Sequence, residues 1–163
     1  MENIVEVRVG IADLNISFSP GRIITVGLGS CIGIAIYDSK NKLGGLAHIM
    51  LPDSTQFSKV TNPHKFADLS IPILVKMMVE NGGELSNMKA KIAGGASMFN
   101  FSDKKMNMDI GNRNGIAVKK ALEKMRIPIL GEDIGGCKGR TMIFDTSNGT
   151  VQIRTVGLGV KEI

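Results

Sequence analysis

Two cysteines and two histidines are the residues of this 163-residue chain best suited to attack a carbonyl, hold a metal or move a proton. Cys31 stands in TVGLGSCIGIAIYD, where a glycine-rich turn passes into an apolar segment, and His48 stands in GGLAHIMLP after a glycine pair. Brought together in space, they would make a minimal thiolate–imidazolium pair, a nucleophile with its own base. Each also has a structural interpretation, because cysteine is often buried core and a histidine in an apolar strand is often hydrogen-bonded core.

The glycines around Cys31 do not match phosphate-binding motifs. The dinucleotide fingerprint G-x-G-x-x-G requires glycine where the chain has Ile32, and no Walker Gly-Lys-Ser or Gly-Lys-Thr follows. The run from Gly29 to Gly33 has the spacing of a nucleophile elbow with cysteine in place of serine. An elbow continues into a helix, whereas IGIAIYD has the β-branched content of a strand. We therefore expect a different fold, in which the small neighbours let a substrate approach backbone N–H donors.

A zinc site built from Cys31, Cys137, His48 and His64 is disfavoured by spacing. Structural zinc sites bring ligands as close pairs, and the chain has no C-x-x-C. We expect no metal. Cys137 is interpreted as a turn or core thiol, and His64 as an exposed residue in the first turn of a helix.

Segments with an apolar period of two, or continuously apolar, predict the strands that would position these residues. They cover residues 3–10, 21–28, 32–38, 43–51, 90–96, 127–133, 140–146 and 149–158. Segments 21–28 and 32–38 are apolar on both faces, which predicts burial between layers. The residues SNG at 147–149 indicate a hairpin between the last two strands.

Two segments show a helical period instead. The first has Asn62 as its N-cap and Pro63 at its first position, and it ends at the glycines of 81–83. The second covers 111–125, with one apolar and one charged face. Strands outnumber helices, so the predicted fold is a layered α/β (α+β) single domain over residues 1–163, with mostly antiparallel strands and two main helices.

Composition narrows the function classes. The net charge of +5 is spread through the chain and aromatic residues make up only 4%, which argues against nucleic-acid binding and allows an acidic protein partner. The first residues, MENIVEVRVG, do not read as a signal peptide, and no apolar run approaches the ~20 residues of a membrane span. We expect a cytoplasmic protein with free thiols and no membrane insertion.

Several motifs together resemble one family. TVGLGSCIGIAIYD, GGLAHIMLP, KFADLSIPILVKMM, AKIAGGASMF, IGNRN and GEDIGGCKGRTMIFDTSNGTV occur in this order between about residues 20 and 155. They are similar to the chemoreceptor glutamine deamidases of the CheD family. The resemblance implies a fold related to the deamidating cytotoxic necrotizing factor toxins. Phe66 stands where the family is expected to have tyrosine, a difference that touches nothing catalytic.

The resemblance also implies site residues and chemistry. Cys31 would be the nucleophile, His48 the base and Thr25 the third member that orients the histidine, although an ordinary strand threonine is the simpler interpretation of Thr25. A receptor glutamine would become glutamate through a Cys thioester, with release of ammonia and no cofactor. Backbone N–H groups of Ser30 and Cys31 are candidates for holding the oxyanion.

Partners follow from the same resemblance. The substrate would be the cytoplasmic domain of chemoreceptors, the methyl-accepting chemotaxis proteins, and the phosphatase CheC would be a binding partner. Phe99 and Phe101, two apart after a glycine pair, are a candidate contact surface for CheC, with core packing as the alternative. Two other functions stay open, a non-catalytic adaptor that binds receptor and CheC, and a methylesterase acting on receptor glutamyl esters.

Overall fold

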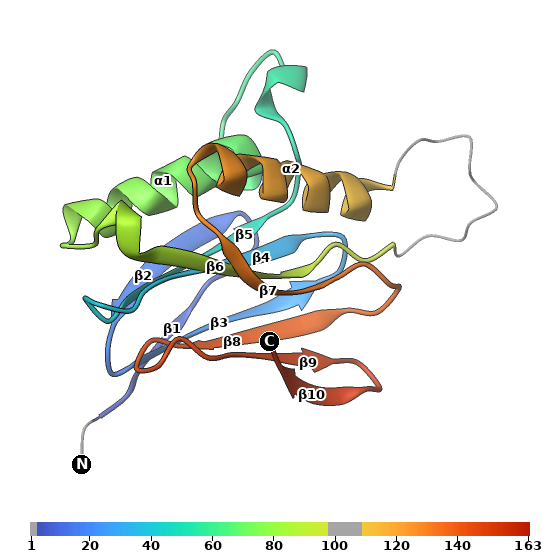
Figure 1. Cartoon of the computed structure of the whole chain (residues 1–163). Helices are drawn as coiled ribbons and strands as arrows, with labels where there is room; N and C mark the ends of the chain where they lie inside the picture. Colours follow the sequence, from blue (N-terminus) through green and yellow to red (C-terminus); the bar gives the residue numbers. More distant parts are fainter. Residues whose placement is uncertain (1–2, 98–108) are drawn as a thin grey trace.

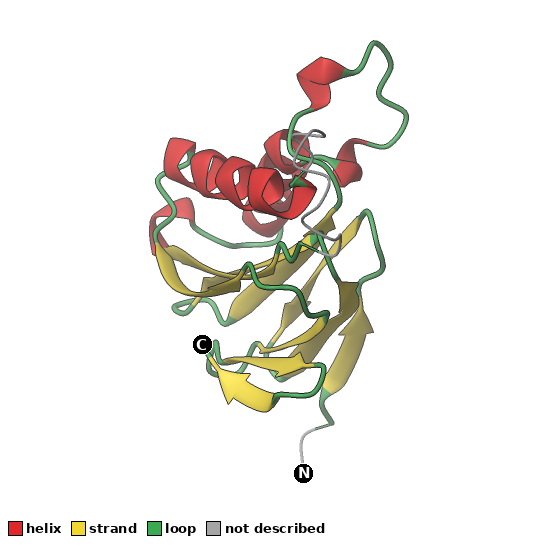
Figure 2. Cartoon of the chain, turned by 90° about the vertical axis from the view of Figure 1, so that its right-hand side faces the viewer, coloured by secondary structure: helices red, strands yellow, loops and turns green. Residues whose placement is uncertain are grey.

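The computed structural model describes residues 3–97 and 109–163, whose strands and helices stack in three layers (Figure 1, Figure 2). The strands are β1 (Val5–Arg8), β2 (Asp13–Phe18), β3 (Gly21–Leu28), β4 (Ile32–Asp38), β5 (Leu43–Ile49), β6 (Met88–Gly94), β7 (Ile129–Ile134), β8 (Arg140–Asp145), β9 (Val151–Thr155) and β10 (Gly159–Glu162). The helices are α1 (Ala67–Glu80) and α2 (Ile110–Lys124), with short 3-10 helices at Ser54–Gln56, Pro63–Lys65 and Leu85–Asn87.

Two five-stranded sheets lie face to face. The outer sheet has the order β1-β3-β8-β9-β10, and the middle sheet has the order β2-β5-β4-β6-β7. Within the described residues, β1 with β3 and β6 with β7 are the parallel pairs, and every other pair is antiparallel. The layered α/β class with mostly antiparallel strands and two main helices is therefore confirmed.

The middle sheet is covered on both faces. Its helix-facing side packs Ile34 of β4 against Leu74 of α1 and Leu122 of α2 in one core cluster. Its other side packs Leu46 of β5 against Met142 of β8 in a second cluster between the sheets. Every residue of β5 is consequently buried, as expected for a strand between two layers.

Among the elements of residues 3–97 and 109–163, the outer sheet is covered on one face only, which corrects the expectation for residues 21–28. Both helices pack on the middle sheet (Figure 1), and the first residues of β3 alternate between buried and partly exposed. Apolar composition alone did not reveal this, because Ile23 faces the core while Ile24 faces outward. Residues 32–38 are buried on both faces as expected, apart from the partly exposed Tyr37.

Two strands were missed by the sequence patterns. β2 pairs with β5 at the edge of the middle sheet, but its polar Asp13, Asn15 and Ser17 weaken the strand signal. The segment 149–158 is not one strand, because β9 ends at Thr155, a turn covers 156–158, and β10 returns antiparallel to β9. The hairpin between β8 and β9 is present as predicted.

The first long helix begins later than predicted. Asn62 does act as a cap, with its side chain accepting from the His64 N–H, but it caps the separate 3-10 helix Pro63–Lys65. Phe66 is extended and bridges Leu51, and α1 begins after it at Ala67. Pairing with the segment that follows β5 thus interrupts the helical path. None of the helices in the described ranges is long and apolar enough to cross a bilayer.

Candidate active site

Three candidate residues come from the two facing sheets. Thr25 lies in β3 of the outer sheet, His48 lies near the end of β5 in the middle sheet, and Cys31 lies in the turn from β3 to β4. The side chains of Thr25 and His48 are almost fully buried, at 1% and 0% exposed. The space between the sheets therefore holds the polar groups of this site.

Strand register places Cys31 and His48 on one face of the middle sheet. Gly33 of β4 pairs with His48, whereas the neighbouring pair of Ile32 and Ile49 faces the helices. Cys31 precedes Gly33 by two residues and packs against the core between the sheets. Cys31 lies one residue before β4, and this packing puts it on the side of the middle sheet that His48 faces, since side chains two apart along an extended chain share a face.

Glycine at position 33 suits this arrangement. A Cβ there would meet Met142 Sδ at 3.0 Å and Leu28 Cδ1 at 3.2 Å, closer than ordinary contacts. A side chain on Gly33 would therefore require Met142 or Leu28 to shift by a few tenths of an ångström.

A hydrogen bond between the sheets orients the imidazole. The Thr25 hydroxyl lies 2.7 Å from His48 Nδ1 and donates to the Val9 carbonyl oxygen, also at 2.7 Å. A hydroxyl has a single hydrogen, so the oxygen of Thr25 accepts from Nδ1–H. This network assigns the proton to Nδ1 and leaves the lone pair on Nε2. Among the described residues, Nε2 has no hydrogen-bond partner.

Burial keeps this histidine neutral. Its pKa is lowered from 6.5 to about 4 by desolvation, because the charged imidazolium is disfavoured away from water. At neutral pH His48 is therefore an unprotonated base whose free lone pair sits on Nε2.

Burial also keeps the Cys31 thiol protonated. Cys31 is half-buried, and desolvation raises its pKa above 9.0, an effect that its own backbone N–H partly offsets. Desolvation therefore favours the neutral thiol and the neutral imidazole over a thiolate–imidazolium pair in the resting state.

The turn that carries Cys31 is tied down by three consecutive carbonyl groups. Gly29 C=O accepts from the Ala96 N–H at 2.8 Å, and Cys31 C=O accepts from the Gly95 N–H at 2.8 Å. Between them, Ser30 C=O accepts from Asn114 Nδ2 at 2.9 Å. At Gly94, with φ of +115°, a Cβ would collide with the Cys31 carbonyl oxygen, so this close approach requires glycine.

Asn114 was not among the sequence candidates. It lies on the buried face of α2, one and two helical turns before Val118 and Leu122. A buried amide on the apolar face of an amphipathic helix is a recognisable signal, because such a group needs hydrogen-bond partners. The partners themselves lie 84 and 64 residues away and could not be read from the sequence.

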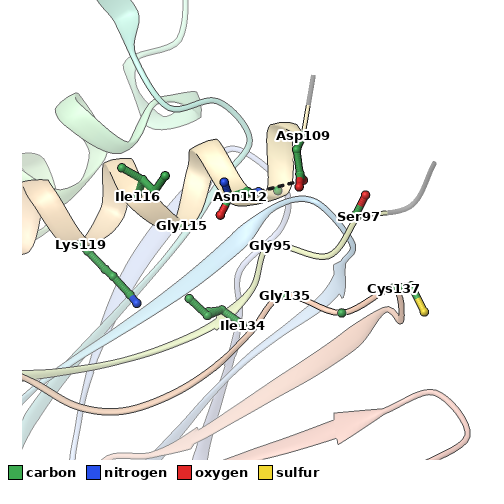
Figure 3. Close-up of a pocket in the computed structure, with 12 residues that line it drawn as sticks. Gly95, Ser97, Asp109, Asn112, Gly115, Ile116, Lys119, Ile134, Gly135 and Cys137 are labelled. Atoms are coloured by element: carbon green, nitrogen blue, oxygen red, sulfur yellow. Dashed lines mark hydrogen bonds between the residues drawn. The ribbon is translucent and has the colours of Figure 1, made fainter. Parts of the chain in front are cut away.

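The remaining candidates lie away from Cys31 and His48 or outside the residues that the structure describes. Cys137 is exposed in the β7–β8 connection. It lines a cavity of about 560 Å³ between the first turns of α2 and the glycine-rich ends of β6 and β7 (Figure 3).

His64 is half-exposed in a 3-10 helix rather than in the first turn of α1. Phe99 and Phe101 fall outside the described residues. Within those residues, no group of three or more His, Cys, Asp or Glu side chains is arranged to hold a metal ion.

A family model and the curated relatives indicate one family. A family model described as "CheD chemotactic sensory transduction" matches residues 50–155. The chain is 76% identical over 162 residues to a "Probable chemoreceptor glutamine deamidase CheD" of Clostridium acetobutylicum, covering 99% of this chain and 98% of that protein. It is 70% identical over 161 residues to a protein of the same name from Clostridium botulinum, covering 99% of each. Among solved structures, it is similar to the hypothetical protein YfiH of Bacillus licheniformis, with a TM-score of 0.44, 14% identity, and coverage of 77% of this chain and 51% of that one.

Proposed function

The chain belongs to the CheD family, and we propose that it is a chemoreceptor glutamine deamidase. It would convert glutamine side chains in the cytoplasmic domains of chemoreceptors to glutamate, with release of ammonia. The names of its relatives support this substrate. The observation that carries the proposal is the 2.7 Å contact between Thr25 and His48 Nδ1, which leaves the Nε2 lone pair unpaired in the space between the sheets against which Cys31 also packs.

The first step joins Cys31 to the substrate. His48 Nε2 takes the thiol proton as the sulfur attacks the side-chain carbonyl carbon of the glutamine. A C–S bond forms, and the π electrons of the carbonyl move to its oxygen to give a tetrahedral oxyanion. Because both shifts favour neutral groups at rest, the thiol proton has to move to Nε2 for the sulfur to attack as a nucleophile.

The oxyanion needs donors that are already in place. We assign this role to the backbone N–H groups of Ser30 and Cys31, which flank the nucleophile. Preorganised donors of this kind contribute about 3 kcal/mol each in comparable acyl-transfer sites. Three anchored carbonyls in the same turn restrict the orientation of these peptides.

The second half of the reaction releases both products. The His48 imidazolium gives its proton to the amide nitrogen, and the C–N bond breaks as the oxyanion re-forms the carbonyl. Ammonia departs, and the acyl group remains bound to Cys31 as a thioester. A water molecule, deprotonated by His48, attacks the thioester carbonyl, and the C–S bond breaks. Glutamate leaves and the thiol regains its proton. This scheme uses only protein groups and water.

Thr25 keeps the imidazole ring of His48 in one orientation throughout the catalytic cycle. Its oxygen holds Nδ1–H, so the ring cannot flip and Nε2 stays the nitrogen that acts as the base. A hydroxyl is a weaker orienting group than a carboxylate, and it avoids placing a second charge between the sheets. The groups named here come from one layered unit, and we propose that residues 1–163 form a single cytoplasmic deamidase domain.

Mass spectrometry of receptor cytoplasmic fragments tests the activity directly. Incubation with the protein should add about one dalton at specific glutamines, because an amide becomes an acid. Absence of this mass gain with folded protein and unmethylated receptor would contradict the proposal. Fragments carrying glutamyl methyl esters test methylesterase action in parallel, since an ester could form the same thioester with methanol as leaving group.

A partner role is proposed beside the enzyme role. The family resemblance implies CheC binding, and we propose Phe99 and Phe101 as its contact residues. Replacing Phe101 by aspartate should weaken CheC binding in isothermal titration while deamidation without CheC persists. An unchanged affinity would remove this residue from the interface, and CheC binding without any receptor deamidation would support a non-catalytic adaptor.

A further inference from the structure

One buried side chain links the nucleophile turn to the strand that carries the base. Asn114 of α2 is 0% exposed, and its Nδ2 donates to Ser30 C=O at 2.9 Å and to Met50 C=O at 3.0 Å. Ser30 directly precedes Cys31, and Met50 follows His48 by two residues. A single carboxamide on the helix layer therefore holds both reacting segments.

The bond to Ser30 also determines where the next N–H points. In a planar trans peptide, the C=O of one residue and the N–H of the next point in opposite directions. With its C=O held by α2, the Ser30–Cys31 peptide turns the Cys31 N–H away from that helix, toward the side where the thiol packs. The approach of this N–H to its own sulfur agrees with that direction, since it lowers the Cys31 pKa.

This N–H is available to a ligand. Across residues 3–97 and 109–163, neither the Ser30 N–H nor the Cys31 N–H donates to another protein group. A backbone donor near the surface without a protein partner is what an oxyanion site requires.

Asparagine at this position has a cost that an apolar residue would avoid. Its Oδ1 is buried and lacks a hydrogen-bond partner within the described chain. A buried unsatisfied polar atom costs about 1–3 kcal/mol. Val118 and Leu122 continue the same buried stripe of α2 with apolar side chains. The two donated hydrogen bonds are the evident compensation.

We propose that Asn114 is a positioning residue for the oxyanion site. It orients the Ser30–Cys31 peptide so that the Cys31 N–H meets the developing oxyanion, and it ties this peptide to the segment behind His48. The inference rests on the proposed deamidase function, which it deepens. The other two anchors of the turn come from the backbone of Gly95 and Ala96, so Asn114 is the anchor that mutation can remove.

Two reactions of the same thiol separate this role from general support of the fold. Acylation by p-nitrophenyl acetate forms a C–S bond through a tetrahedral oxyanion and expels p-nitrophenolate. Alkylation by iodoacetamide displaces iodide at a saturated carbon and forms no oxyanion. Both are measured in a Cys137→Ser background so that Cys31 alone reports. Asn114→Ala is compared with Asn112→Ala, which removes an exposed asparagine from the same helix.

Asn114→Ala should slow acylation about tenfold to a thousandfold, the range for a displaced oxyanion donor. Alkylation should stay within about threefold, and receptor deamidation should lose kcat with little change in KM. Asn112→Ala should match the parent in all three assays. Acylation at the parent rate, or an equal fall in acylation and alkylation, would overturn the proposal.

Two further measurements keep the test decisive. Thermal unfolding sets an assay temperature below each Tm, and if Asn114→Ala does not fold, Asn114→Ser replaces it. Serine keeps one donor, so a smaller selective loss of acylation supports the role and an unchanged ratio of the two rates rejects it. If the parent is acylated but never deamidates receptor fragments, the proposed function fails while the acylation ratio still decides the role of Asn114.

Discussion

The chain places cysteine and histidine in two contrasting regions. Cys31 and His48 lie at the space between two sheets, where His48 is fully buried and Cys31 is half-buried. Cys137 and His64 lie in connecting segments, with Cys137 exposed and His64 half-exposed. The same residue types therefore occur in a region that largely excludes solvent and in a region that is exposed to it.

The contrast teaches that environment, more than residue type, decides what these groups can do. Between the sheets, desolvation makes neutral forms favourable, and a second sheet supplies Thr25 to set the histidine tautomer. His64 instead belongs to a turn in which Asn62 binds its backbone N–H. Variants of matching residues from the two regions, at Cys31 and Cys137 and at His48 and His64, measure how much each environment contributes to activity.

The largest expected difference in activity is between the variants that remove the two thiols. Cys31→Ala should abolish receptor deamidation because no group remains to form the thioester, and Cys31→Ser should be nearly inactive because a hydroxyl is far less ionised than a thiol. Cys137→Ala should retain the parent rate. Mass spectrometry of receptor fragments gives both results, and wild-type turnover by folded Cys31→Ala would show that the nucleophile lies elsewhere.

The next largest expected difference in activity is between the variants that remove the two imidazoles. His48→Ala should lower kcat about a hundredfold to ten-thousandfold with a smaller change in KM, as for loss of a general base. The remaining rate should rise with pH, because burial raises the Cys31 pKa and hydroxide must then replace the base. His64→Ala should follow the parent. A raised KM with unchanged kcat in His48→Ala would contradict the base role.

Loss of the orienting hydroxyl should be intermediate. Thr25→Val removes the acceptor that orients His48 Nδ1–H, and a loss of about 1–3 kcal/mol at this contact would lower kcat roughly fivefold to 150-fold. The variant also leaves the Val9 carbonyl oxygen without its donor, which lowers the stability of the fold and not kcat itself. Thr25→Ser keeps both hydrogen bonds and should recover most of the rate. Equal rates for Thr25→Val and the parent would leave Thr25 as a strand residue alone.

Local patterns predicted much of the fold and singled out the residues of the site. Strand β4 and helix α2 have strong internal periods, so their position follows from neighbouring residues. β2 was missed because its pairing with β5, not its own composition, stabilises it. Cys31 and His48 were noticed because each follows glycines in an apolar setting, while Thr25 came from the family resemblance.

The protonation states and the anchoring of the site could not be predicted in this way. The neutral pair depends on how two sheets exclude water from Cys31 and His48, which no spacing along the chain describes. Asn114 reaches carbonyls of two distant segments, and that contact exists only after α2 packs on the middle sheet. Long-range packing, rather than any motif, determines both features.

The smallest expected effect is a nearly flat response to mild acid. An ordinary histidine base with a pKa near 6.5 would lose about tenfold in its neutral fraction between pH 7.5 and 5.5. With a pKa of about 4, His48 stays unprotonated over this range. We therefore expect kcat/KM at about pH 5.5 to remain within about twofold of its value at pH 7.5.

Stability needs a separate check, because the same pKa shift acts on folding. The folded state resists protonation of His48, so between pH 6.5 and about 4 the unfolded state binds more protons and stability falls as the pH falls. At pH 5.5 this difference amounts to about 1 kcal/mol, which a thermal melt at each pH would register. His48→Asn should lack this component, whereas His64→Ala should keep it. An acid limb of kcat/KM near pH 6.5 in protein that is still folded would mean that water reaches the base, and the contrast between the two regions would then be smaller than their burial indicates.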